Sequence, residues 1–174
     1  MAKLILPSKK YIDSARAAMK ERYTFGEISK KDLQEELELM GNPDTYVKNI
    51  LDKRKSIGLK PGQSPLTRYW LIDNGEYVGT LGLRHKTTTQ TRDREGNMGY
   101  HIRPSKRKSG YGTEALRLGL LKAKNIGLKS VYINCSKNNI ASIRIIEKNG
   151  GVQRDKKKDD GDNSDSVHYI IKLT

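Results

Sequence analysis

A basic turn that contains two glycines has the residue types of a loop that binds phosphate. The turn reads Arg107-Lys108-Ser109-Gly110-Tyr111-Gly112-Thr113. It lies between a strand-like run, 98–103, and a helix-like run, 114–126. Backbone N–H groups at the beginning of a helix, together with the positive end of the helix dipole, bind phosphate oxygens. We interpret the turn as a phosphate-binding loop, and the alternative is an ordinary glycine-containing connection between a strand and a helix.

Gly110 and Gly112 fit this interpretation because a ligand can approach main chain that carries no Cβ. One or both positions can also require a positive φ, which glycine adopts at low cost. Arg107 opens the turn and Lys108 stands beside it, so cations flank the expected phosphates. A G-x-G pattern is weak by itself, and the strand-to-helix context makes it more specific.

The length and composition favour one globular domain that spans 1–174. A chain of 174 residues can bury one core but is short for two domains of ordinary size. No apolar run approaches the roughly 20 residues that cross a bilayer, and the first apolar stretch is too short for a secretory signal. The single cysteine, Cys135, excludes an intrachain disulfide and a cysteine-based metal site. These features predict a cytoplasmic protein.

The formal net charge of +14 draws anions to the surface. Nucleic acid and a polyphosphorylated cofactor are both candidates, and a lysine-rich solvated surface is the simplest interpretation. The Lys and Arg residues are spread along the chain, and no aromatic-rich RNA-recognition strand or zinc-finger spacing is present. The sequence therefore disfavours nucleic acid. Local anion capture by Lys106, Arg107 and Lys108 is compatible with the solvated surface.

The first third of the chain predicts a short strand followed by three amphipathic helices. The strand lies at 4–6, and Ser8, Ser29 and Asn42 then serve as N-caps of successive helices. The apolar residues that recur at helical spacing are interpreted as core positions rather than ligand contacts. After a loop at 60–65, two β-rich runs joined by Asp73-Asn74-Gly75 predict a hairpin, because Asn-Gly is a strong hairpin signal.

The second half predicts strand, glycine turn, helix, strand and helix. The strands lie at 97–103 and 129–134, and Asn138 or Asn139 caps the last helix of this unit. Their separation allows parallel pairing. A charged loop at 155–166 leads to a final strand. A calcium loop there is disfavoured because lysines would occupy ligand positions, so we expect no metal.

The segment 97–151 resembles the acetyl-coenzyme A binding core of the GNAT superfamily of N-acetyltransferases. The first two matching motifs are Gly99-Tyr100-His101-Ile102-Arg103-Pro104 and Arg107-x-x-Gly110-x-Gly112. The third is Asn139-x-x-Ser142 followed by Ile146-Glu147-Lys148-Asn149-Gly150. Three motifs in the family's order are more specific than any one. The resemblance covers about 66–155, and the whole chain looks most like bacterial GNAT-type predicted acetyltransferases that begin with Leu-x-x-Pro-Ser.

The resemblance implies an α/β fold: a mixed, twisted sheet of six to seven strands with helices on both faces and splayed fourth and fifth strands. It implies acetyl-CoA as co-substrate, with the glycine turn on the pyrophosphate and the fourth strand pairing with the pantetheine arm. The implied cofactor-binding residues are Ile102, Arg103, Arg107, Lys108, Ser109, Gly110, Tyr111, Gly112, Thr113, Asn134, Asn139 and Ser142.

The implied reaction is direct attack of a primary amine on the thioester in a ternary complex. An alkylammonium must lose its proton first, which costs roughly 4 to 5 kcal/mol at pH 7. His101 and Glu95 are the candidate bases, and His85 is a further one. Strand alternation places His101 opposite to Tyr100, and either face is open as the cleft.

The departing thiolate benefits from an acid, and the family often has a tyrosine at the position of Ile146. Isoleucine cannot transfer a proton, which leaves Ser142, a water molecule or unassisted departure. Backbone amides at 100–102 are the natural donors to the oxyanion. The implied direct transfer needs no covalent cysteine, so Cys135 is interpreted as a packed thiol.

Two other functions compete with the acetyltransferase. One is a non-catalytic acyl-CoA binding module, which the isoleucine at 146 favours, and the other is a nucleic-acid-binding protein. The sequence leaves the acceptor open between a small amine, a peptide N-terminus and a lysine side chain, because 20–65 and 85–96 align weakly with the family. A polycationic acceptor is disfavoured unless Glu35, Glu36 and Glu38 gather at the cleft. A homodimer is an open expectation.

Overall fold

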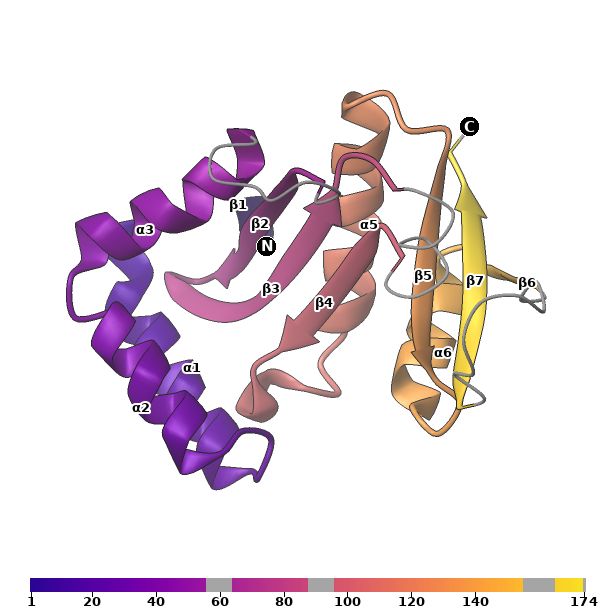
Figure 1. Ribbon diagram of the computed structural model, residues 1–174. Helices are drawn as coiled ribbons and strands as arrows, with labels where there is room; N and C mark the ends of the chain where they lie inside the picture. Colours follow the sequence, from indigo (N-terminus) through magenta and orange to yellow (C-terminus); the bar gives the residue numbers. More distant parts are fainter. Residues whose placement is uncertain (56–63, 88–95, 155–164, 174) are drawn as a thin grey trace.

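Two β-sheets stand next to each other in the computed structural model, which describes residues 1–55, 64–87, 96–154 and 165–173 (Figure 1). The four-stranded sheet has the order β1-β2-β3-β4 and the three-stranded sheet the order β5-β7-β6. The strands are β1 Lys3–Ile5, β2 Leu66–Asp73, β3 Glu76–Arg84, β4 Met98–Ile102, β5 Ser130–Ser136, β6 Val152–Arg154 and β7 Ser166–Lys172. The helices are α1 Ile12–Thr24, α2 Lys30–Leu39, α3 Pro43–Asp52, α5 Tyr111–Asn125 and α6 Ile140–Lys148, with the 3₁₀ turns η1 Lys9–Tyr11, η2 Lys53–Lys55 and η3 Pro104–Lys106.

The predicted helix caps are present in the first third of the chain. Ser29 and Asp32 form a capping box at the start of α2, and the Asn42 side chain accepts from Thr45 N ahead of α3. The Ser8 hydroxyl caps the tight turn η1 instead, and α1 begins four residues later. No described helix has the length and apolar composition needed to cross a membrane.

The predicted hairpin joins β2 to β3. Asn74 and Gly75 both have positive φ, 46° and 79°, as a type I′ turn requires. Every β2–β3 pair is antiparallel, and β3 pairs in the same way with β4. This register fixes which side chains of the three strands share a face.

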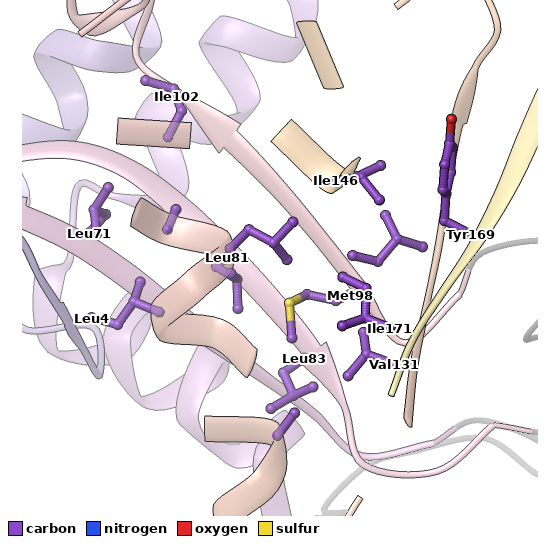
Figure 2. Packing of buried hydrophobic residues seen from close by; sticks show 14 of the residues in the cluster. Leu4, Leu71, Leu81, Leu83, Met98, Ile102, Val131, Ile146, Tyr169 and Ile171 are labelled. Carbon is purple, nitrogen blue, oxygen red and sulfur yellow. The ribbon is translucent and has the colours of Figure 1, made fainter. Parts of the chain in front are cut away.

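Helices cover both faces of the four-stranded sheet, as the resemblance implied. On one face Leu81, Leu83 and Met98 pack with α5 and with residues of the second sheet such as Val131 and Ile171 (Figure 2). On the other face Trp70 and Ile72 of β2 pack against α1 and Met40, the residue that follows α2. The larger cluster spans both sheets and therefore holds them together.

The two sheets touch where β4 begins. Asn97 N donates to Tyr132 O at 2.7 Å, and Tyr132 N donates to the Asn97 side chain at 3.1 Å. After this contact β4 and β5 belong to different sheets. The parallel pairing expected from spacing alone is therefore confined to one point, and the splay implied by the family resemblance is confirmed.

Gly96 makes this contact possible, and Gly96→Ala is expected to destabilise the fold by about 3 kcal/mol. Its φ is +69°, and an added Cβ would lie 2.4 Å from the Tyr132 carbonyl oxygen. Urea unfolding measures the change. Gly75→Ala is the matched control, since its φ is +79° but its Cβ would meet nothing within 4 Å, and it should lose only about 1 kcal/mol. Equal losses would show that the sheet contact tolerates the methyl group.

Candidate functional site

The glycine turn has the geometry of an anion-binding loop. Gly110 precedes α5 as its N-cap with φ +82°, and no side chain caps the helix. A Cβ at Gly110 would meet nothing within 4 Å, so the main chain there faces open space. The first-turn N–H groups of α5 have no partner within the helix, and with the helix dipole they suit a phosphate. Lys108 also has positive φ, 60°, which helps to bend the loop.

The second glycine has a different role. Gly112 is buried, and a Cβ there would lie 2.6 Å from the Ile145 side chain. Gly112 therefore lets α5 approach α6 closely. Of the two glycines, Gly110 is the one that faces open space.

Two side chains of the loop turn away from its main chain. Arg107 Nε donates to the Ile102 carbonyl at 3.1 Å, and its guanidinium also pairs with Glu27. The Tyr111 hydroxyl donates to Asp73 at 2.8 Å. The backbone amides, rather than these side chains, are thus the part of the loop that remains for an anion.

The gap between β4 and β5 lies beside this loop. Apart from the contact at Asn97, no backbone hydrogen bond joins β4 to β5 within the described ranges. This edge of β4 is therefore unpaired with a strand, although the Ile102 carbonyl accepts from Arg107 Nε. Arg103 N bonds to Val78 on the opposite side, and its guanidinium is tied to Glu21 of α1 at 2.7 Å. An open strand edge can accept an extended ligand as an added strand.

Polar groups of three elements meet in this gap. Asn139 caps α6 by accepting from Ser142 N at 3.0 Å. The Ser142 hydroxyl neighbours the buried hydroxyl of Tyr100 on β4, and Cys135 of β5 also acts on Tyr100. Burial raises the pKa of Tyr100 and that of Cys135, although Ser142 acts in the opposite direction on Tyr100. The Tyr100 hydroxyl therefore keeps its proton at neutral pH, and the sequence analysis did not name this side chain as a candidate acid.

A cavity of about 380 Å³ occupies the face of the sheet that is turned away from α5. The strand register explains its shape, because Gly82 pairs with Gly99 and neither fills the space above the sheet. Its described lining residues are Arg22, Leu66, Arg68, Thr80, Gly82, Arg84, Gly96, Asn97, Met98, Gly99, Tyr100 and His101. The cavity side of β4 is therefore the side to which His101 points, which strand alternation alone left open.

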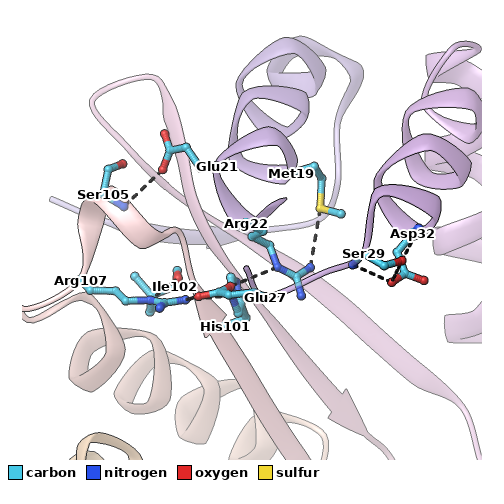
Figure 3. A network of polar contacts seen from close by, with 10 residues as sticks. All are labelled: Met19, Glu21, Arg22, Glu27, Ser29, Asp32, His101, Ile102, Ser105 and Arg107. Atoms are coloured by element: carbon cyan, nitrogen blue, oxygen red, sulfur yellow. Dashed lines mark hydrogen bonds and ion pairs between the residues drawn. The ribbon is translucent and has the colours of Figure 1, made fainter. Parts of the chain in front are cut away.

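His101 forms a polar triad with Glu27 and Arg107 (Figure 3). His101 Nε2 lies 2.9 Å from Glu27 Oε2 and 3.2 Å from Arg107 Nη2. Glu27 follows the end of α1 and also pairs with Arg22. Within the described residues Nδ1 of His101 makes no hydrogen bond. One ring nitrogen is thus oriented by a carboxylate, and the other is left for a substrate proton.

The charges around the triad favour a neutral imidazole and an ionised carboxylate. Burial lowers the pKa of His101, the charges of Arg22 and Arg107 lower it further, and Glu27 opposes this shift. Burial would raise the pKa of Glu27, but hydrogen bonds from His101 and Arg107 bring it below its usual value. A neutral imidazole beside an ionised carboxylate is a suitable general base.

NMR titration of the histidine ring protons is expected to place the pKa of His101 below the usual value of about 6.5. Glu27→Gln should lower it further, because the carboxylate that favours the imidazolium is removed. His85 is the matched control: its pKa is also lowered by burial, and its Nε2 lies 2.7 Å from Thr67 Oγ1 rather than near Glu27. A rise in the pKa of His101 in Glu27→Gln would contradict the assigned geometry.

The structure places the remaining candidates as follows. His85 does not line the cavity, and Glu95 lies outside the described residues. Ile146 is fully buried in the larger core cluster, and Asn134 is on β5. Within the described ranges, no group of three or more His, Cys, Asp or Glu side chains could hold a metal ion.

The sequence analysis missed Glu27, Arg22 and Arg68. The first two lie more than 70 residues before β4, and no spacing pattern connects them with His101. Alternation counted from the hairpin turn would have set Arg68 opposite Leu81, because the register shifts between Leu71 and Ile72, and the observed pairing sets Arg68 opposite Gly82 instead.

Comparison with known proteins gives one family and a consistent fold. The model of the acetyltransferase (GNAT) domain matches residues 21–152. No curated protein sequence matches the chain.

Three solved structures illustrate the fold similarity. The microcin C7 self immunity acetyltransferase MccE, in complex with acetyl-CoA and AMP, is 13% identical over 99% of this chain and 92% of its own, with a TM-score of 0.67. An acetyl transferase from Salmonella typhimurium that modifies the N-terminal serine of a 50S ribosomal subunit protein is 12% identical over 99% and 95%, with a TM-score of 0.65. The N-acetyltransferase PseH from Campylobacter jejuni, in complex with acetyl coenzyme A, is 12% identical over 100% of both chains, with a TM-score of 0.60. At these identities the similarity shows the fold alone.

Proposed function

The chain belongs to the GNAT acetyltransferase family, and we propose that it transfers the acetyl group of acetyl-CoA to a primary amine by direct attack in a ternary complex. The observation that carries the proposal is that β4 borders two sites. The edge of β4 that is not paired with a strand borders the gap next to the Gly110 loop. The face of β4 that is turned away from α5 carries His101 at the cavity. An amine in the cavity and a thioester in the gap would meet across a single strand.

Acetyl-CoA occupies the gap in this proposal. The pyrophosphate lies on the amides that follow Gly110, and the pantetheine arm runs along the edge of β4 at Ile102. Asn139 and Ser142 at the start of α6 border its other side. Two of the similar structures described above contain acetyl-CoA, which supports the assignment of the co-substrate.

His101 accepts the proton that the amine must lose. At pH 7 an alkylammonium with a pKa near 10.4 is deprotonated at a cost of about 4.6 kcal/mol. A neutral imidazole held by Glu27 reduces this cost by taking the proton as the nitrogen attacks the thioester carbon. The C–N bond forms, the carbonyl becomes an oxyanion, and amides on the open edge of β4 donate to it.

The C–S bond then breaks and the electron pair leaves with sulfur. Tyr100 and Ser142 meet in the gap, and the raised pKa of Tyr100 keeps its hydroxyl protonated at neutral pH. We assign to this pair the proton that the thiolate takes up, in the role for which Ile146 is unsuited. The attacking nitrogen loses its second proton as the intermediate collapses to the amide, and this proton restores the hydroxyl of the pair.

Release of coenzyme A thiol with a panel of primary amines tests the proposal. We expect thiol release that depends on both acetyl-CoA and the amine, together with an amine product heavier by one acetyl group in mass spectrometry. Tight acetyl-CoA binding without turnover across the panel would favour the non-catalytic acyl-CoA binding module. Nucleic-acid binding that collapses with salt and does not compete with acetyl-CoA would favour the nucleic-acid-binding alternative.

A further inference from the structure

We propose that the acceptor is a small amine that also carries an anionic group, a carboxylate or a phosphate, and that Arg68 and Arg22 bind this group. The inference rests on the proposed function and names the substrate class of the same cavity. It starts from the charges of the cavity wall rather than from the chain's overall charge.

The described lining of the cavity is strongly cationic. It contains Arg22, Arg68 and Arg84 in addition to His101, and it contains no Asp or Glu. A concave site lined by one sign of charge focuses the field and raises the local concentration of the oppositely charged ligand. The lining therefore favours an anionic acceptor and opposes a polycation or a lysine-rich peptide.

Two carboxylates of the described helical region that packs on this side of the sheet are already engaged. Glu27 pairs with His101, Arg107 and Arg22, and Glu36 of α2 accepts from the Tyr46 hydroxyl at 2.5 Å. Arg68, in contrast, makes no hydrogen bond or ion pair with the described residues, although its charge acts on Tyr46. An arginine that borders a cavity without a carboxylate partner is suited to bidentate binding of a carboxylate or phosphate from a ligand.

The strand register places Arg68 across the cavity floor from the proposed base. Arg68 pairs with Gly82, and Gly82 pairs with Gly99, so no side chain stands between β2 and β4 in this row. An added Cβ at Gly99 would meet nothing within 4 Å, which leaves the floor open. At about 4.8 Å between strands, Arg68 and β4 are separated by roughly 10 Å of main chain.

Arg22 approaches from the roof of the cavity. It extends from α1 beside the triad, with its Nε 3.5 Å from Glu27 Oε2, and it also lines the cavity (Figure 3). An anion between Arg22 and Arg68 would therefore lie within one small molecule's length of His101. A volume of about 380 Å³ fits a small metabolite.

Matched amine pairs test the inference. The pairs are 4-aminobutyrate against butylamine for the carboxylate, and phosphoethanolamine against ethanolamine for the phosphate. We expect the wild type to prefer the anionic member of at least one pair in kcat/KM by about 30-fold, which corresponds to one charged, hydrogen-bonded contact. The pair with the larger ratio identifies the acidic group.

Arg68→Gln separates anion recognition from the reaction. It should reduce kcat/KM about 30-fold for the anionic amine, change it less than about twofold for the neutral one, and leave the KM of acetyl-CoA unchanged. Arg117→Gln is the matched control, because Arg117 is exposed on α5 and pairs with Glu114 away from the cavity. Arg68→Glu should replace the preference for anionic amines by a preference for diamines, which carry a second positive charge.

The outcomes distinguish the inference from the proposed function. Turnover without a preference for anionic amines, or an equal loss for both members in Arg68→Gln, would overturn the inference and leave the acetyltransferase in place. If acetyl-CoA binds but no amine is acetylated, the proposed function fails. The inference is then decided by binding: the anionic amine should shift the His101 NMR signals of the wild type and not those of Arg68→Gln, and equal shifts in both proteins would overturn it.

Discussion

Gly110→Asp is expected to weaken acetyl-CoA binding by 100-fold or more in a calorimetric titration. The substitution places a carboxylate at the N-cap of α5, where the amides that follow are proposed to hold the pyrophosphate. Charge repulsion there replaces an attraction between the anion and the helix N-terminus. A 100-fold loss of affinity corresponds to about 2.7 kcal/mol of binding free energy. A direct contact with a doubly charged group can contribute this amount.

Gly127→Asp is the matched control for the backbone. Gly127 follows the same helix at its other end, has φ +84° against +82° for Gly110, and has nothing within 4 Å of its Cβ position. Both variants therefore carry similar strain, and their melting temperatures should fall together. Retained affinity in Gly110→Asp, or equal losses in both variants, would remove the loop from the cofactor site. Gly112 is unsuited to this test, because a side chain there would collide with Ile145.

Local chemistry made most of the fold predictable. The Asn74-Gly75 turn, the Ser29 and Asn42 caps and the glycine that begins α5 each act over a few residues, so the sequence alone specifies them. The resemblance then supplied what local signals could not, namely that the sheet splits between β4 and β5. The number of residues between the two strands predicted ordinary parallel pairing. It does not reveal that the sheets touch only at the start of β4, where Gly96 approaches Tyr132.

The candidate site was predictable on its cofactor side and hidden on its acceptor side. The glycine turn and the Asn139 cap are contiguous motifs. The cavity is assembled from α1, β2, β3 and β4, and the hydrogen bond that orients His101 joins it to Glu27 across 74 residues of sequence. Helix and strand periodicity relates only residues that are close in sequence. The direction in which His101 points could therefore be decided only by the three-dimensional structure.

The same assembly separates the elements of the acceptor side from those of the proposed cofactor side. Helix α5, which the loop precedes, packs in the core cluster that spans both sheets. The roof of the cavity is supplied by α1, which Glu21 ties to Arg103 and to Ser105 N at the end of β4. Changes in α1 and the hairpin can therefore alter acceptor recognition without disturbing the acetyl-CoA site.

His101→Ala is expected to reduce kcat at pH 7 by about 100- to 1,000-fold, with the dissociation constant of acetyl-CoA unchanged. General-base catalysis typically contributes factors of this size, and His101 contacts the cavity rather than the gap between β4 and β5. Steady-state kinetics measures kcat, and calorimetry measures the affinity. His85→Ala is the matched control, because His85 bonds to Thr67 outside the cavity and should leave kcat within about twofold of the wild type.

The pH dependence distinguishes a base from a structural residue. The neutral fraction of an alkylamine with a pKa near 10.4 rises about tenfold per pH unit below that value. The deficit of His101→Ala should therefore shrink as the pH rises from 7 to 9, because the amine then arrives without its proton. Glu27→Gln should show a smaller deficit at pH 7, since it keeps the imidazole and removes only the carboxylate that orients it. A deficit that stays constant across this range would assign His101 to positioning, and the base would have to be sought elsewhere in the cavity.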